Sequence, residues 1–177
     1  MLTKDLQEIF NKHKKDKWLS GNLVPLEEKE RYGIIFISEK LSDHFLKRPE
    51  LKSLGNFNAT SIDKAFHCYL QKYNFGKIYA TDMIKTQGKT SSNFIEEWNS
   101  DKSFKNCLEE EIRCYKPTLI VFMSNKVEDL FNKNFKEIHI ERFKIYHPSY
   151  VYRYKKFKEW DKQFKSLKNK IVKLSIK

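Results

Sequence analysis

Two hydrophobic patterns alternate along this chain. Short apolar runs of β-forming residues, typical of strands buried on both faces, lie at 33–38, 77–81, 118–123 and within 138–146. Between and after these runs, apolar residues recur three or four positions apart and predict helices at about 61–73, 104–115, 126–131 and 155–171. Because a helix between two strands returns the chain to the same edge of a sheet, this alternation predicts an α/β fold with a parallel sheet.

Two further segments lie outside this alternation. The first has apolar residues at helical spacing in Lys-rich sequence, at Leu2, Leu6, Ile9 and Phe10. We expect an amphipathic helix there, which ends before the turn-rich stretch 20–25 and packs on the flank of the domain. The second, from Thr86 to Asp101, has no clear periodicity, and we interpret it as a loop that forms a lid over a pocket.

Length and composition place the chain in the globular class. It has 177 residues, of which 40% are hydrophobic and 33% charged, with only five Gly and four Pro, so we expect one domain over residues 1–177. The cysteines are Cys68, Cys107 and Cys114, an odd number without a C-x-x-C pair. This pattern supports neither a disulfide framework nor a standard metal site, and we interpret them as reduced thiols.

The charge balance indicates an anionic partner. Lys and Arg total 35 and Asp and Glu total 23, which leaves a formal net charge of +12. Such an excess attracts polyanions, either a nucleic acid or an anionic membrane. The sequence lacks both a long apolar run and a signal segment. We therefore expect a cytoplasmic, monomeric protein whose partner is DNA rather than a membrane.

Polar residues follow each predicted strand. They are Ser38-Glu39, Asp82, Ser124-Asn125 and His147-Pro148-Ser149. Each has an ordinary explanation on its own, as a solvated loop acid, a helix cap or a surface side chain. In a parallel sheet, however, the carboxyl ends of the strands meet at one edge, where ligands bind. Two carboxylates, a polar pair and a histidine at that edge predict a reaction centre.

The order and spacing of these residues resemble the uracil-DNA glycosylase superfamily. The resemblance is greatest to the bacterial and archaeal branch with Gly-Glu-x-Pro, Thr-Asn and His-Pro-Ser motifs, and it runs from about Tyr32 to Tyr154. It implies a three-layer sandwich around a four-stranded parallel sheet in the order 2-1-3-4. It also implies a monofunctional DNA glycosylase, which flips a base out of the stack, releases it and leaves an abasic site.

The resemblance also implies roles for individual residues. Glu39 falls on the position that activates water, and His147 on the one that donates a hydrogen bond to the departing base. Phe57 lies where the family often stacks an aromatic ring on the extruded base. Thr86 replaces the cysteine of relatives with an iron–sulfur cluster, so we expect an enzyme without a cluster, metal or other cofactor.

Asp82 departs from the family, which usually has Asn there to read the base edge. An Asn amide complements uracil, whereas an ionised Asp offers acceptors only and suits the exocyclic amine of cytosine. A proton on Asp82 would be needed to pair with cytosine N3. We therefore expect a modified cytosine as substrate and a role in defence against phage with hypermodified DNA. Ser38 and Asn125, beside the neighbouring strand ends, are further candidates for substrate binding.

The segment after the His-Pro-Ser motif interleaves aromatic and basic residues, which is typical of a DNA-binding surface. Our candidates for DNA contacts, in this segment and after the second strand, are Lys85, Lys89, Ser149, Tyr150, Arg153 and Lys155. Ser38, Lys40 and Leu41 replace the Gly, Ala and Pro of the family's first motif. The changed first motif leaves open a non-catalytic DNA-binding relative. A uracil repair glycosylase and an enzyme of RNA or free nucleosides are two further alternatives.

Overall fold

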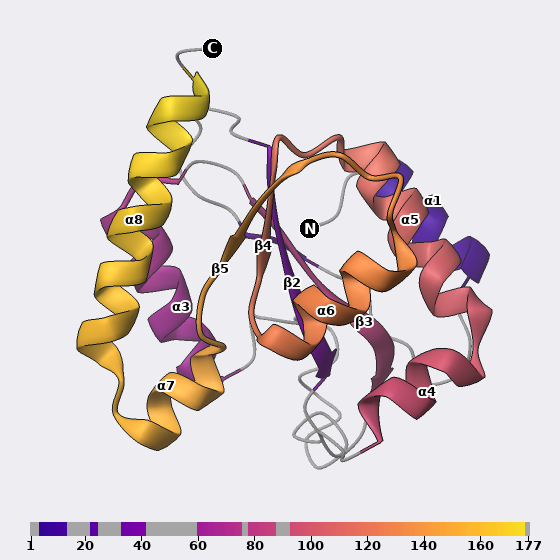
Figure 1. The fold of residues 1–177 in the computed structure, drawn as a ribbon, viewed down its shortest axis with the longest axis horizontal. Helices are drawn as coiled ribbons and strands as arrows, with labels where there is room; N and C mark the ends of the chain where they lie inside the picture. The colour runs from indigo at the N-terminus through magenta and orange to yellow at the C-terminus, as the bar shows by residue number, and fades with distance from the viewer. Residues whose placement is uncertain are drawn as a thin grey trace.

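A five-stranded sheet forms the middle layer of the protein (Figure 1). The computed structural model describes residues 4–13, 22–24, 33–41, 60–75, 78–87 and 93–175. Its strands are β1 (Asn22–Val24), β2 (Ile34–Leu41), β3 (Ile78–Gln87), β4 (Leu119–Phe122) and β5 (Glu141–Lys144). They lie in the order β1-β3-β2-β4-β5. The last four pair in parallel, which confirms the predicted four-stranded parallel core and its order.

The edge strand β1 was not predicted from the sequence. It pairs antiparallel with β3 over three residues, with Leu23 opposite Tyr79. A three-residue strand is too short to produce a recognisable hydrophobic pattern. The sheet is therefore one strand wider than expected, while its parallel core is as expected.

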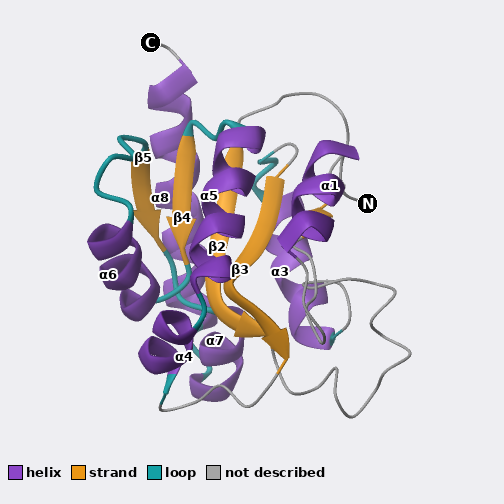
Figure 2. Ribbon diagram, turned by 90° about the vertical axis from the view of Figure 1, so that its right-hand side faces the viewer, coloured by secondary structure: helices purple, strands orange, loops and turns teal. Residues whose placement is uncertain are grey.

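Helices cover both faces of the sheet, as Figure 2 shows. The helices are α1 (Lys4–His13), α3 (Ser61–Lys72), α4 (Phe94–Ser100), α5 (Lys102–Tyr115), α6 (Asn125–Asn134), α7 (Pro148–Tyr154) and α8 (Phe157–Ser175). On one face, α1, α4, α5 and α6 pack against Ile35 and Ile37 of β2. On the other face, α3, α7 and α8 pack against Ile34 and Phe36. Alternate residues of β2 thus belong to two separate cores, which explains its uninterrupted apolar sequence.

The segment expected to be a lid loop is partly helical. The strand β3 continues to Gln87, and α4 occupies residues 94–100. Phe94 and Trp98 are four residues apart and both are buried, so one turn of apolar spacing holds this short helix against the domain. Seven residues show too few periods of the hydrophobic pattern for the sequence to predict α4. None of the described helices has the length and apolar character needed to span a membrane.

The residues after the last strand form a helix that was not expected as a separate element. His147 is the N-cap of α7 and Pro148 occupies its first turn, where the fixed backbone angle of proline suits a helix. The helix ends at Tyr154, and its C-cap Lys155 adopts a left-handed conformation with φ of 55°. The final helix α8 therefore begins at Phe157 rather than at 155.

Phe164 of α8 joins the outer helices to one another through aromatic contacts. Its ring centroid lies 5.2 Å from those of both Tyr69 and Trp160, and 5.7 Å from that of Phe75. The side chain is completely buried. We expect Phe164→Ala to lower the free energy of unfolding by about 3–5 kcal/mol, because it removes the ring and leaves a cavity.

This prediction is checked by urea denaturation of both proteins. Val172→Ala on the same helix is the matched control, because Val172 is exposed and its truncation should change stability by no more than about 0.5 kcal/mol. Equal losses in the two variants would contradict the central packing role of Phe164.

Candidate functional site

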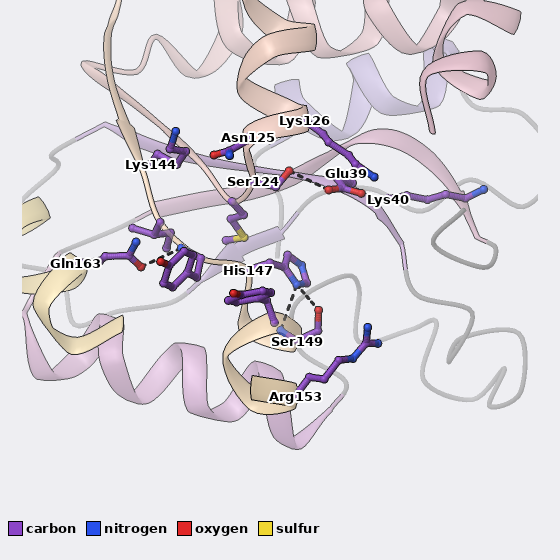
Figure 3. A pocket seen from close by; sticks show the side chains of 14 residues that line it. Glu39, Lys40, Ser124, Asn125, Lys126, Lys144, His147, Ser149, Arg153 and Gln163 are labelled. Atoms are coloured by element: carbon purple, nitrogen blue, oxygen red, sulfur yellow. Dashed lines mark hydrogen bonds between the residues drawn. The ribbon is translucent and has the colours of Figure 1, made fainter. Parts of the chain in front are cut away.

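A cavity of about 450 Å³ opens at the carboxyl ends of β2, β4 and β5. The walls are formed by these strand ends together with the start of α6 and by α7. Six of the residues singled out in the sequence line it, namely Glu39, Asn125, His147, Ser149, Tyr150 and Arg153. In Figure 3, Glu39 and Ser124 lie on one wall, and His147 and Ser149 lie on the wall across from it.

Glu39 is held in place by a residue 85 positions away in the chain. The hydroxyl of Ser124 donates a hydrogen bond to Glu39 Oε1 over 2.9 Å. Ser124 is also the N-cap of α6 and accepts a hydrogen bond from the backbone N–H of Val127 at 3.2 Å. A hydroxyl can donate once while it accepts, so both bonds form together. Ser124 thus ties the orientation of the carboxylate to the start of α6.

His147 presents a neutral imidazole. Its Nδ1 accepts the backbone N–H of Ser149 at 3.2 Å and lies 2.6 Å from the Ser149 hydroxyl. An acceptor at Nδ1 places the single ring proton on Nε2. Desolvation of the ring lowers the pKa of His147 from 6.5 to about 4. The group is therefore an uncharged Nε2–H donor at neutral pH, and its role toward a departing base stays a prediction.

Asp82 and Ser38 lie beneath the strand ends rather than on the cavity wall. They face each other in the parallel register of β2 and β3, and the Ser38 hydroxyl bonds to Asp82 Oδ1. Asp82 is only 3% exposed and Ser38 only 1%. Burial raises the pKa of Asp82 from 3.8 to about 7, although the Ser38 hydrogen bond and the positive charge of Lys85 oppose the rise.

Lys85 is buried, which corrects the prediction that it contacts DNA. It has no exposed surface, and its Nζ donates to Glu111 Oε2 at 2.7 Å and to the Asp82 carbonyl oxygen at 2.7 Å. Tyr79 donates a further hydrogen bond to Glu111 at 3.0 Å. The prediction failed because β3 extends to Gln87, so Lys85 is still inside the sheet and pairs with α5.

The remaining candidates fall into two groups. Lys155 is exposed as the C-cap of α7 and does not line the cavity. Phe57 and Lys89 lie outside the described residues, so their roles stay predictions. Within the described part of the chain, no group of three or more His, Cys, Asp or Glu side chains is arranged to hold a metal ion.

Three lysines that the sequence analysis did not select also line the cavity, namely Lys40, Lys126 and Lys144. Lys40 forms an ion pair with Glu97 of α4 at 2.5 Å. Lys144 pairs with Glu128 of α6 at 2.8 Å. With Arg153 these lysines place four cationic side chains on the cavity wall, two of them paired with glutamates, and we call the four the cationic rim. Ser124 follows a predicted strand and is not among the predicted site residues, although a serine at a predicted helix start is a strong N-cap signal.

One comparison with known protein families gives a match. Residues 17–168 match the family model described as the Uracil DNA glycosylase superfamily. The matched segment includes all five described strands and every described residue that lines the cavity. A search of curated proteins finds no match.

The buried position of Asp82 predicts a distinct dependence of stability on pH. Its pKa in the folded protein, about 7, lies above the ordinary 3.8, so the folded state keeps a proton that the unfolded chain has lost. The retained proton stabilises the folded state, and the contribution of Asp82 to the free energy of unfolding is complete below pH 3.8. This contribution is lost as the pH rises through 7, at up to about 1.4 kcal/mol per pH unit. We expect Asp82→Asn to become more stable relative to the wild type as the pH rises from 4 to 7.

Urea denaturation of both proteins across this pH range measures the effect. His147 titrates in both and cancels in the difference. A stability difference that does not change with pH would show that Asp82 has an ordinary pKa.

Proposed function

The chain belongs to the uracil DNA glycosylase superfamily, and we propose that it hydrolyses the N-glycosidic bond of a non-standard pyrimidine in DNA. The released base leaves an abasic site behind. The observation that carries this proposal is that Glu39, fixed by Ser124, and neutral His147 line the same cavity. Membership of the family supports a DNA glycosylase, and these two groups are the ones such a reaction needs.

Glu39 and His147 stabilise the two charges that develop as the N-glycosidic bond breaks. The sugar becomes cationic, and the carboxylate of Glu39 both favours that charge and accepts a proton from the attacking water. The base departs with negative charge, and the Nε2–H of His147 donates a hydrogen bond to it. Because the imidazole is already neutral, it stabilises the leaving base without giving up a proton first. Water thus adds to the sugar, and its proton is taken up at Glu39.

The cationic rim supplies the affinity for the DNA backbone. Lys126 and Arg153 lie at the cavity and are exposed, and the chain as a whole carries a net charge of +12. Lysine and arginine side chains neutralise phosphates and release counterions. Ser149, which is exposed beside His147, is placed to hold a phosphate next to the flipped nucleotide. These contacts would position DNA without reading its sequence.

We further propose that Asp82 selects the base, and that a modified cytosine is the preferred one. The raised pKa of Asp82 supports a retained proton near neutral pH. A protonated carboxyl group can donate to cytosine N3 and accept from its N4 amine. The same carboxyl group pairs with uracil if it rotates so that its donor and acceptor oxygens exchange places. A substrate panel therefore decides between defence against modified phage DNA and repair. Contact with the base requires an opening toward Asp82, since it does not line the described cavity.

The catalytic role of Glu39 has a direct test. Glu39→Gln should abolish base release, by about 100-fold or more, because an amide neither accepts the water proton nor stabilises a cationic sugar. Affinity for DNA should be unchanged or slightly higher. Ser124→Gly should reduce release less severely, since the carboxylate remains but loses its hydrogen bond, and glycine is tolerated as an N-cap.

Base release is measured from oligonucleotides by cleavage at abasic sites, with binding measured on the same DNA. Ser124→Thr, which retains a hydroxyl, is the matched control and should keep activity. Full activity of Glu39→Gln would exclude the proposed mechanism. If the wild type binds DNA but releases no base, a non-catalytic relative is the better description.

The role of Asp82 is tested with a panel of DNAs that contain uracil, cytosine, hydroxymethylcytosine or glucosylated hydroxymethylcytosine. The wild type should release a modified cytosine, and Asp82→Asn should shift release toward uracil, because an amide has a fixed donor and acceptor. Release is followed by identification of the free base. A wild type that releases uracil alone would contradict the assignment of Asp82 as a cytosine reader.

A further inference from the structure

Three exposed tyrosines form a row beside the cavity. Tyr146, Tyr150 and Tyr154 are 39%, 42% and 54% exposed, and they are three of the five large hydrophobic residues that are exposed in the described part of the chain. We call this row the tyrosine ladder. Solvent-exposed rings gathered in one place indicate a surface that another molecule covers.

The geometry of the ladder is continuous. The ring centroids of Tyr146 and Tyr150 are 5.0 Å apart, and those of Tyr150 and Tyr154 are 4.7 Å apart, with an interplanar angle of 44° in both pairs. Tyr150 and Tyr154 are four residues apart on α7, which places their rings on one face of that helix. Tyr146 precedes the helix and extends the row through its ring contact with Tyr150. Tyr146 and Tyr150 line the cavity and Tyr154 lies beyond it. The ladder therefore leads from the cavity outward along the surface.

Cationic side chains accompany the ladder. Arg153 lines the cavity and is exposed, and Lys155 and Lys158, just after α7 and at the start of α8, are exposed as well. Aromatic rings for bases and cations for phosphates are the two components of surfaces that bind single-stranded nucleic acids. A protein partner with an apolar surface would not explain this density of positive charge.

We propose that the tyrosine ladder stacks on unpaired nucleotides next to the target base, so that the protein binds single-stranded DNA in preference to duplex. Bases in a duplex already stack on both faces and leave no face for a row of rings. In a single strand each base offers a free face, and the target base reaches the cavity without the free-energy cost of unpairing. This inference rests on the proposed function in one respect, because it assumes that the bound DNA strand leads to the cavity.

Binding of the full chain to an unmodified oligonucleotide of about 12 nucleotides, and to its duplex, tests the ladder by fluorescence anisotropy. The wild type should bind the single strand more tightly than the duplex. Tyr154→Ala should weaken binding to the single strand roughly tenfold and leave the duplex unchanged, because a stacking contact to one base is lost. Tyr154→Phe keeps the ring and should restore affinity.

The dependence on salt separates stacking from charge. Tyr154→Ala should weaken binding equally at low and high salt, whereas Lys155→Ala should reduce the slope of log affinity against log salt concentration. Tyr152→Ala is the control on the same helix, because the ring of Tyr152 packs against Phe157 and lies outside the ladder. Thermal unfolding of each variant verifies that it is folded.

The outcomes distinguish the ladder from the proposed catalysis, because the unmodified oligonucleotide contains no base that the proposed enzyme would release. Loss of single-strand affinity in Tyr154→Ala supports the ladder even if the wild type releases no base from any substrate. Unchanged single-strand affinity in Tyr154→Ala overturns it even if the wild type is an active glycosylase. Equal weakening for single strand and duplex also overturns it and indicates a ring that inserts into duplex DNA.

Discussion

The parallel pairing of β2 with both of its neighbours is the constraint on which the site depends. Ile37 of β2 lies opposite Phe122 of β4, and Ser38, the next residue, lies opposite Asp82 of β3. Because the backbone hydrogen bonds fix this register, a slip of one residue would turn every side chain to the other face. The pairing with β4 brings Glu39 within reach of Ser124, and the pairing with β3 brings Ser38 to Asp82. The contacts Glu39–Ser124 and Ser38–Asp82 therefore both depend on the register of β2.

The edge of the sheet separates two electrostatic environments. On the cavity side, Glu39 is half-buried among lysines and next to the start of α6. Beneath it, Asp82 is buried close to the Lys85–Glu111 ion pair. A buried ion pair contributes little net stability by itself, but breaking one leaves an uncompensated charge. The pair therefore links this end of β3 to α5, and Lys85 also donates a hydrogen bond to the Asp82 carbonyl oxygen.

The aromatic layer on the opposite face positions the other half of the site. The rings of α3 and α8 meet at Phe164 and Trp160, and Tyr69 donates a hydrogen bond to the Phe157 carbonyl at the start of α8. This packing holds α8 where α7 can bridge it to the end of β5. His147 lies at the start of α7, so its position depends on a core far from the cavity. Tyr150 and Tyr154 of the tyrosine ladder lie on the exposed face of that same helix.

Much of this arrangement could be predicted from the sequence. Strands buried on both faces must be apolar throughout, and helices that pack on a sheet need an apolar stripe. The hydrophobic pattern therefore predicts the parallel core and its main helices. The strand-end residues, among them Glu39 and His147, follow from that pattern and from the resemblance to the family. Local signals were weaker for short elements, and β1, α4 and α7 were missed for that reason.

Only the tertiary structure decided the contacts between distant segments. Nothing near Lys85 in the chain shows that Glu111 will cover it, and nothing near Glu39 shows that Ser124 will orient it. The four-residue spacing of the tyrosines is visible in the sequence, but a buried stripe has the same spacing as an exposed one. Hydrophobic periodicity records which face of an element is apolar, whereas burial and pairing depend on what the rest of the chain places against that face.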